Sequence, residues 1–356
     1  MILMSKRILA AACAAATALA LSACSPSAST GGKASKDGTL TVMASFYPLK
    51  YLAEKVGGEH VTVTSLTPDG AEPHDLELSP KMVDSLASAD AVVYLAGFQG
   101  AVDEAIEQHA PTTVIDVSSA AQLVAIDSTS NHPGEDEGTD EAQSGEAQSG
   151  EAADHDHEGH DHEHADSDHE HADHDHADHD HHHDMSMDPH FWLDPARMAN
   201  AATLVGDKLA EADPTNAETY KANAQALNKE LTSLGDNLVT KTSTCQIKTF
   251  VTAHTAFGYL ADRTGLTQVG ISGLDPESSP SPARLAEIGK IAKDQGVTTI
   301  FTEALIDPKV AQTLADDLGI STAVLDPIES QTDSSKDYAA VMNDNIDALT
   351  KANNCQ

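Results

Sequence analysis

The chain is 356 residues long, which is enough for two domains with ordinary cores. Its formal net charge is −37, but 20 acidic residues and no Lys or Arg lie between His132 and Asp184, which leaves −17 for the rest. So acidic a chain excludes nucleic acid as a partner, because nucleic acid requires a basic surface, and it favours metal cations.

The first 23 residues have the pattern of an export signal. Lys6 and Arg7 precede an Ala/Leu-rich apolar run that is too short for a transmembrane helix. The run ends in Leu-Ser-Ala-Cys, which resembles the bacterial lipobox, so we expect residues 1–23 to be removed and Cys24 to carry lipid. Residues 24–38 then form a flexible tether. An ordinary cleaved signal peptide is the alternative.

An N-terminal lobe is expected over residues 39–195, where short β-rich segments alternate with helical ones. Such alternation indicates βαβ units and a mostly parallel sheet. Ser79 followed by Pro80 is typical of a helix start, with the serine as N-cap and the proline at the first helical position. We expect strands at 39–45, 61–67, 91–97 and 112–118, and helices at 47–57, 79–89 and 102–110.

The alternation is interrupted at about residues 126–187 by Ser/Gly/Glu repeats and then a tract rich in His and Asp. Neither segment could bury a core, which predicts a disordered insertion. Flexible His/Asp repeats bind divalent metals weakly and without fixed geometry; a solvated acidic spacer is the alternative. The candidate accessory ligands in this tract are His155, His157, His160, His162, His164, His169, His171, His174, His176, His179, His181, His182 and His183.

Helical patterns dominate residues 196–243, and alternation resumes in a C-terminal lobe over 244–356. Residues 214–243 read as one helical run, which would span roughly 43 Å and could bridge two lobes. The predicted fold class is therefore α/β, with two lobes of mostly parallel sheet joined by one long helix. In the second lobe we expect strands at 247–253, 266–272, 297–303 and 321–327, and helices at 256–265, 281–296, 307–319 and 335–353.

Besides Cys24 in the lipobox, two cysteines remain in the mature chain, Cys245 and Cys355. A lone pair in an exported protein suggests a disulfide, which would tie the start of the C-terminal lobe to the end of the chain. Two unpaired thiols are the alternative.

Four candidate metal ligands follow predicted strands or the insertion. In open α/β sheets, ligands bind beyond the carboxyl ends of the strands. His74, His254 and Glu329 occupy such loops, and His190 lies where order resumes after the insertion. Three imidazoles and one carboxylate suit tetrahedral zinc, whereas manganese, the alternative metal, prefers more oxygen.

The fourth, acidic position has alternatives. Glu72 lies two residues before His74, and Glu303 ends a predicted strand. Either could replace Glu329 as a ligand or orient a bound histidine, and water could also complete the coordination.

The chain contains the motifs EPHDLELSP, DPHFWLDP, AHTAFGYLADRTGL, GLDPESSPSPARL, FTEALIDPKVAQTLADDLG and VLDPIES. Together these motifs resemble the zinc branch of the cluster A-I (ZnuA/AdcA/TroA-like) solute-binding proteins of bacterial metal ABC transporters. The resemblance covers about residues 39–355 and implies two α/β lobes around one rigid helix, with the metal at the lobe interface. By motif it places the three histidine ligands on His74, His190 and His254 and the acidic one on Glu329. Manganese-type members tend to have a carboxylate where His254 stands.

The resemblance implies a receptor that is held at the outer face of the cell membrane through Cys24. It would bind one Zn²⁺ tightly, with weaker sites in the insertion, and deliver the metal to an ABC permease. We expect a monomer that is not an enzyme. The alternatives are a metal-buffering or adhesive lipoprotein without a transport role, and a zinc hydrolase, for which no H-E-x-x-H motif occurs.

Overall fold

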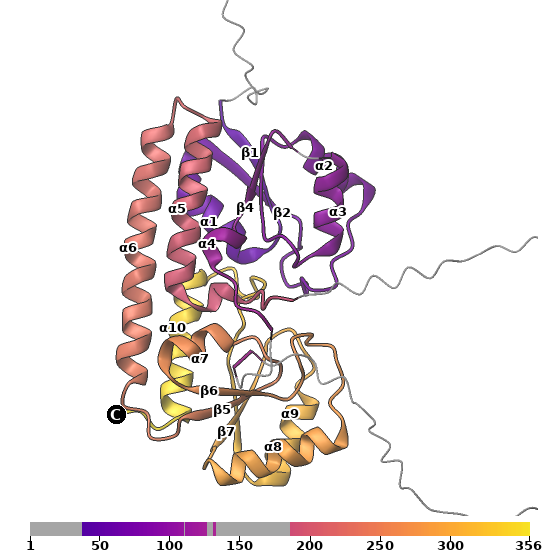
Figure 1. The fold of residues 1–356 in the computed structure, drawn as a ribbon, viewed down its shortest axis with the longest axis vertical. Helices are drawn as coiled ribbons and strands as arrows, with labels where there is room; N and C mark the ends of the chain where they lie inside the picture. The colour runs from indigo at the N-terminus through magenta and orange to yellow at the C-terminus, as the bar shows by residue number, and fades with distance from the viewer. Residues whose placement is uncertain (1–37, 110, 127–130, 133–185) are drawn as a thin grey trace, which may run out of the picture. The chain divides into compact units, whose positions relative to one another are not determined.

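Two four-stranded parallel sheets form the framework of the protein in a computed structural model, which describes residues 38–109, 111–126, 131–132 and 186–356 (Figure 1). The strand order is β2-β1-β3-β4 in the first sheet and β6-β5-β7-β8 in the second, so the two lobes repeat one topology. The predicted α/β class is confirmed. The strands are β1 Leu40–Ala44, β2 Val61–Ser65, β3 Ala91–Tyr94, β4 Thr113–Asp116, β5 Thr249–Thr252, β6 Thr267–Gly270, β7 Thr299–Thr302 and β8 Ser321–Val324.

Helices connect the strands of the first lobe where the sequence predicts them. The Ser79 side chain accepts a hydrogen bond from the backbone N–H of Met82, and Pro80 is the first helical residue, as expected for this helix start. The four-residue α4 was not predicted, because one turn is too short to show a period. The elements are α1 Tyr47–Gly57, the 3₁₀ helix η1 Gly58–His60, α2 Pro80–Ser88, α3 Gly100–His109 and α4 Ser118–Ala121.

A long helix, α6 (Ala217–Thr242), packs against elements of both lobes. It contacts α1 of the first lobe and α7 and α10 of the second, and it lies along α5 over much of its length (Figure 1). This is the bridging helix that the sequence predicts. The other elements of this part are η2 Phe191–Leu193, α5 Pro195–Ala212, α7 Gly258–Thr264, α8 Pro282–Asp294, α9 Lys309–Leu318 and α10 Tyr338–Ala352.

One hydrophobic core is shared by the two lobes. It includes Leu52 of α1, Leu231 of α6 and Ile346 of α10, all fully buried, together with Trp192. Two smaller clusters lie beneath α2 and α3 in the first lobe and beneath α8 and α9 in the second. The shared core gives the two lobes a common apolar support, so residues at their junction have well-packed surroundings.

A disulfide between Cys245 and Cys355 fastens the C-terminus beside the end of α6, as the cysteine pair suggests. Among the described residues, no helix has the length and apolar character needed to cross a membrane. The predicted signal peptide, its lipobox cysteine and the tether lie outside the described residues.

Ordered structure extends further into the region of the insertion than the predicted bounds of 126–187. Ala125 and Met187 form an antiparallel bridge, and the backbone N–H of Ile126 donates to the Ser186 carbonyl at 2.9 Å. Asn131 and His132 also make defined contacts with the second lobe. Residues 127–130 and 133–185, including the His tract, lie outside the described residues.

Candidate metal centre

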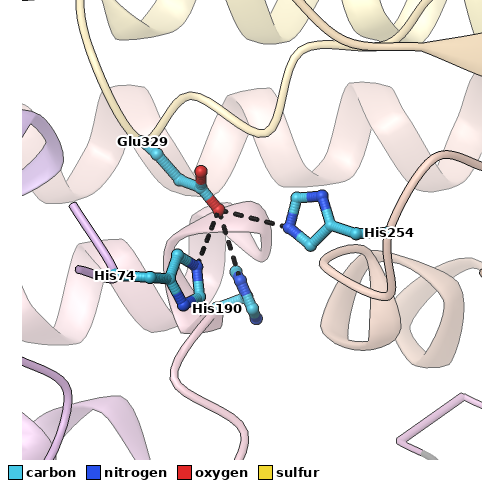
Figure 2. Close-up of side chains that lie close together, drawn as sticks. All are labelled: His74, His190, His254 and Glu329. Atoms are coloured by element: carbon cyan, nitrogen blue, oxygen red, sulfur yellow. Dashed lines mark hydrogen bonds and ion pairs between the residues drawn. The ribbon is translucent and has the colours of Figure 1, made fainter. Parts of the chain in front are cut away.

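Four side chains from separate loops converge at the junction of the lobes (Figure 2). His74 lies between β2 and α2, His190 precedes η2, His254 follows β5, and Glu329 follows β8. Parallel strands place their carboxyl ends at one edge of a sheet. The His74 loop therefore lies at that edge of the first sheet, and the His254 and Glu329 loops lie at that edge of the second. The structure thus brings together the four residues that the sequence singles out.

The Glu329 carboxylate stands at nearly equal distance from the three imidazoles. Its Oε1 lies 3.4 Å from Nε2 of His74, 3.3 Å from Nε2 of His190 and 3.4 Å from Nε2 of His254 (Figure 2). All four donor atoms lie within 4.8 Å of one another. A tetrahedral zinc ion with bonds of about 2.0–2.1 Å separates its donor atoms by about 3.3–3.4 Å, so the spacing around Oε1 fits such an ion.

Two of the imidazoles are oriented by carboxylates that lie on the far side from the centre. Asp188 Oδ1 accepts from both the backbone N–H and the ring Nδ1 of His190, at 2.9 and 2.8 Å. Glu303 Oε1 does the same for His254, at 3.1 and 2.7 Å. Such a bond at Nδ1 leaves Nε2 as the metal-facing nitrogen. Within the described part of the chain, the buried Nε2 atoms of His190 and His254 have no well-aligned hydrogen-bond partner.

His74 is held differently and forms the accessible side of the centre. Its backbone N–H donates to Glu72 Oε2 at 2.9 Å, while Glu72 Oε1 lies 3.9 Å from its Nε2. The edge of its ring packs against Phe98. Its side chain is 6% exposed and that of Glu72 is 19% exposed, whereas His190 and His254 are fully buried. An ion would therefore enter from the side of His74 and Glu72.

The turn before Glu329 carries backbone strain. Ile328 has φ 57°, which places a β-branched residue in the left-handed region. Its N–H donates to Asp326 Oδ1 at 2.8 Å, and Trp192 Nε1 donates to the Pro327 carbonyl at 2.7 Å. These bonds hold a conformation that is otherwise unfavourable, and the turn presents Glu329 to the three imidazoles.

The charges of the centre are strongly coupled. Burial raises the pKa of Glu329, but its interactions with the three imidazoles outweigh burial and hold that pKa well below its usual range. Burial lowers the pKa of His254, yet Glu303 and Glu329 reverse the shift and raise the pKa well above 6.5. For His190, Asp188 and Glu329 overcome burial in the same way and raise the pKa. Without metal the site therefore favours protonated His190 and His254 beside an ionised Glu329.

The candidates that the sequence left open also have defined places. Glu303 supports His254 from behind, and Glu72 borders the centre beside His74 without belonging to the converging group. Asp188, which orients His190, was not predicted. A signal was available, because Glu72 and Asp188 each stand two residues before a histidine, in the motifs EPH and DPH. Binding of a metal by these residues stays a prediction at this point.

Both the family profile and the individual relatives that match this chain are described as zinc-uptake or zinc-binding proteins. The profile of the ZnuA family, described as "Zinc-uptake complex component A periplasmic", matches residues 42–352. The high-affinity zinc uptake system protein ZnuA of Bacillus subtilis is 32% identical over 94% of both chains. The zinc-binding protein AdcA of Streptococcus pyogenes serotype M3 is 34% identical over 88% of this chain, which spans only 56% of that relative.

The fold comparison agrees. The crystal structure of the Zn(II)-bound ZnuA-like domain of Streptococcus pneumoniae AdcA is similar, with a TM-score of 0.65 and 27% identity over 89% of this chain and 99% of that one. The range matched by the family profile covers both lobes and includes the loops that carry the converging residues. The chain belongs to the ZnuA family of periplasmic zinc-uptake components.

Proposed function

We propose that this chain is an extracytoplasmic receptor that captures one Zn²⁺ between its two lobes and delivers it to an ABC permease for import. The observation that carries the proposal is the convergence of three imidazole nitrogens and one carboxylate oxygen in a site that is largely buried from solvent. An N₃O set at this spacing suits tetrahedral zinc. The names of the relatives, which refer to zinc binding and zinc uptake, support the same cargo.

The donor set also favours zinc over manganese. Manganese prefers more oxygen ligands and a higher coordination number, and His254 supplies a nitrogen where an oxygen would serve manganese better. Because Asp188 and Glu303 fix the orientations of His190 and His254, each of these histidines offers a single nitrogen to the ion, which favours a low coordination number.

A receptor fits the centre better than a zinc hydrolase does. A hydrolytic zinc site keeps one position open for water and needs a general base beside it. Here the protein itself supplies four donors, and Glu303, one candidate base beside the centre, is hydrogen-bonded to the ring and the backbone N–H of His254. Glu72, the other candidate, accepts the backbone N–H of His74.

The location of the receptor is part of the proposal. The lipobox at Cys24 would anchor the mature protein to the outer face of the membrane, with residues 24–38 as its tether. A diacylglyceryl group brings more than one acyl chain, which stable attachment requires. The His tract would be an accessory that binds further zinc weakly.

The experiment is a chelator-competition titration with Zn²⁺ and Mn²⁺. The mature chain is compared with a variant lacking residues 135–184, a deletion that keeps His132 and the strand bridge at Met187. Trp192, the sole tryptophan, has its ring centroid 5.2 Å from that of His190 and provides the fluorescence signal. We expect one tight zinc site in both proteins, additional weak sites only in the intact chain, and poor manganese binding.

A contrary result would be equally clear. Loss of the tight site in the shortened variant, with its fold intact by circular dichroism, would assign zinc binding to the His tract and refute the two-lobed site. Stoichiometric binding of Mn²⁺ with an affinity equal to that of Zn²⁺ would refute the cargo assignment.

A further inference from the structure

His132 lies buried between two carboxylates and contacts the one that orients His190. Its Nδ1 is 2.7 Å from Asp188 Oδ2, and its Nε2 is 2.8 Å from Asp262 Oδ2. Two carboxylate partners require a proton on each ring nitrogen, which the imidazolium form provides. In keeping with this, the two carboxylates overcome the effect of burial and raise the pKa of His132.

Asp188 therefore has both oxygens engaged. Oδ1 accepts the backbone N–H and the ring Nδ1–H of His190, while Oδ2 accepts from His132. Burial of the fully enclosed Asp188 is outweighed by its bonds to the two histidines, which hold its pKa at about 2. Rotation of the Asp188 carboxylate about its Cβ–Cγ bond would break hydrogen bonds to the histidines, so the contact with His132 at Oδ2 restricts the carboxylate that orients His190.

His132 is itself held by the second lobe. Its ring meets the Tyr259 ring edge to face, with centroids 4.9 Å apart. A Cβ at Gly258 would come within 2.7 Å of the His132 ring, so only glycine leaves room for this contact. The neighbouring Asn131 donates to Asp262 Oδ1 at 2.8 Å and accepts from the backbone N–H of Gln268 at 3.1 Å.

We propose that His132 is a positioning residue for the metal centre, which acts through Asp188 to aim Nε2 of His190 at the ion. The inference rests on the proposed function, because it concerns the binding of zinc by His190. It adds a link from the centre to α7 of the second lobe, running from His190 through Asp188 and His132 to Asp262. Without a donor at Oδ2, Asp188 can turn, and His190 loses its fixed direction.

The test uses three substitutions in the full mature chain. His132→Phe keeps an aromatic ring against Tyr259 and removes both donors. His132→Asn retains an N–H at the position of Nδ1, toward Asp188, whereas His132→Gln retains one at the position of Nε2, toward Asp262. Direct hydrogen-bond partners of metal ligands typically contribute about 10–100-fold in affinity. His132 contacts such a partner, Asp188, and not a ligand itself. We therefore expect His132→Phe and His132→Gln to raise the zinc Kd by about tenfold, the lower end of that range, and His132→Asn to stay close to wild type.

Two readouts separate positioning from a general loss of stability. The visible spectrum of the Co²⁺-loaded protein should change in His132→Phe and His132→Gln and be retained in His132→Asn, because it reports ligand geometry. The melting temperatures of the metal-free variants report stability alone, so for a positioning role they are not expected to follow the order of the cobalt spectra. If His132→Phe does not fold, the comparison of the Asn and Gln variants still decides the matter.

The outcomes distinguish this inference from the proposed function. Tight zinc binding by the wild type with equal Kd values and cobalt spectra for the Asn and Gln variants would overturn the role of His132 alone. Absence of tight zinc binding in the wild type would overturn the receptor proposal and this inference together.

Discussion

Protons and zinc compete for the same imidazole nitrogens around Glu329. In the metal-free site, the interaction between His254 and Glu329 contributes both to the raised pKa of His254 and to the lowered pKa of Glu329. Zinc requires neutral imidazoles, so its binding must release the protons that these pairs retain. In the proposed site, the carboxylate that would help to bind zinc would thus also influence the pH at which zinc can bind.

The pH dependence follows from the signs of these shifts. A raised histidine pKa stabilises the folded protein at pH below about 6.5, the unfolded value, and this contribution is lost as pH rises through the folded pKa. A lowered Glu329 pKa contributes above about 4.5 and is lost as pH falls through the folded value. The ion pairs therefore stabilise the metal-free protein most between about pH 4.5 and 6.5.

Above about pH 6.5 the metal-free protein loses the stabilisation from these ion pairs, whereas we expect its zinc affinity to rise between pH 6 and 8. Glu329→Gln removes the charge that retains the protons, so its zinc affinity should be lower at pH 8, by tenfold or more, and less dependent on pH. Zinc Kd values and proton release, measured calorimetrically in buffers of different ionisation enthalpy, check both expectations. Glu277→Gln, at an exposed glutamate, is the matched control and should behave as wild type. Equal proton release by wild type and Glu329→Gln would contradict the assignment.

At the scale of elements, the close approach of α5 and α6 depends on a glycine. A Cβ at Gly206 would lie 2.4 Å from the Cβ of Ala224, so the two helices could not keep their spacing with a larger residue there. Gly289 in α8 offers a contrast, because its nearest neighbour, Leu318 Cδ2, would lie at an ordinary 3.6 Å.

The same substitution should therefore have opposite effects at these two helical positions. Gly206→Ala forces α5 and α6 apart and should destabilise the protein by about 1–2 kcal/mol, even after the gain in helix propensity. Gly289→Ala adds helix propensity without a clash and should stabilise by about 0.5–1 kcal/mol. Urea unfolding of the metal-free proteins measures both. A Gly206→Ala variant as stable as Gly289→Ala would show that the helix pair tolerates wider spacing.

Most elements and the converging residues could be predicted from local patterns, but the links between them could not. The predicted helix at 47–57 coincides with α1, because its apolar period and the turn residues at its end are local signals. Once the strands are assigned, the loops at their carboxyl ends point to His74, His254 and Glu329. The contacts of His132 with Asp188 and Asp262 join residues 56 and 130 positions apart. Such contacts depend on how the lobes pack, and no periodicity in the sequence records them.

At the scale of the whole molecule, the two lobes share a core and both contribute residues to the candidate metal centre. The central apolar cluster contains side chains of α1, α6 and α10, and α6 contacts both lobes. Gly70 in the first lobe also donates its N–H to Ser330 Oγ in the second, at 2.7 Å. Ligands drawn from both lobes should make zinc a stabiliser of the whole unit and not of one lobe.

Zinc should accordingly shift a single unfolding transition. In the variant lacking residues 135–184, free zinc at about 100 times the Kd should add about 2.7 kcal/mol, or about 5 °C in Tm for a chain of this size. Trp192 reports the lobe junction through its bond to the Pro327 carbonyl, whereas far-UV circular dichroism reports helices of both lobes. The two signals should coincide with and without zinc, because neither lobe keeps its core when the other unfolds. A zinc-dependent shift in the fluorescence transition, with a separate circular dichroism transition that does not move, would instead mean that one lobe folds independently. The metal would then act as a clamp between two autonomous domains.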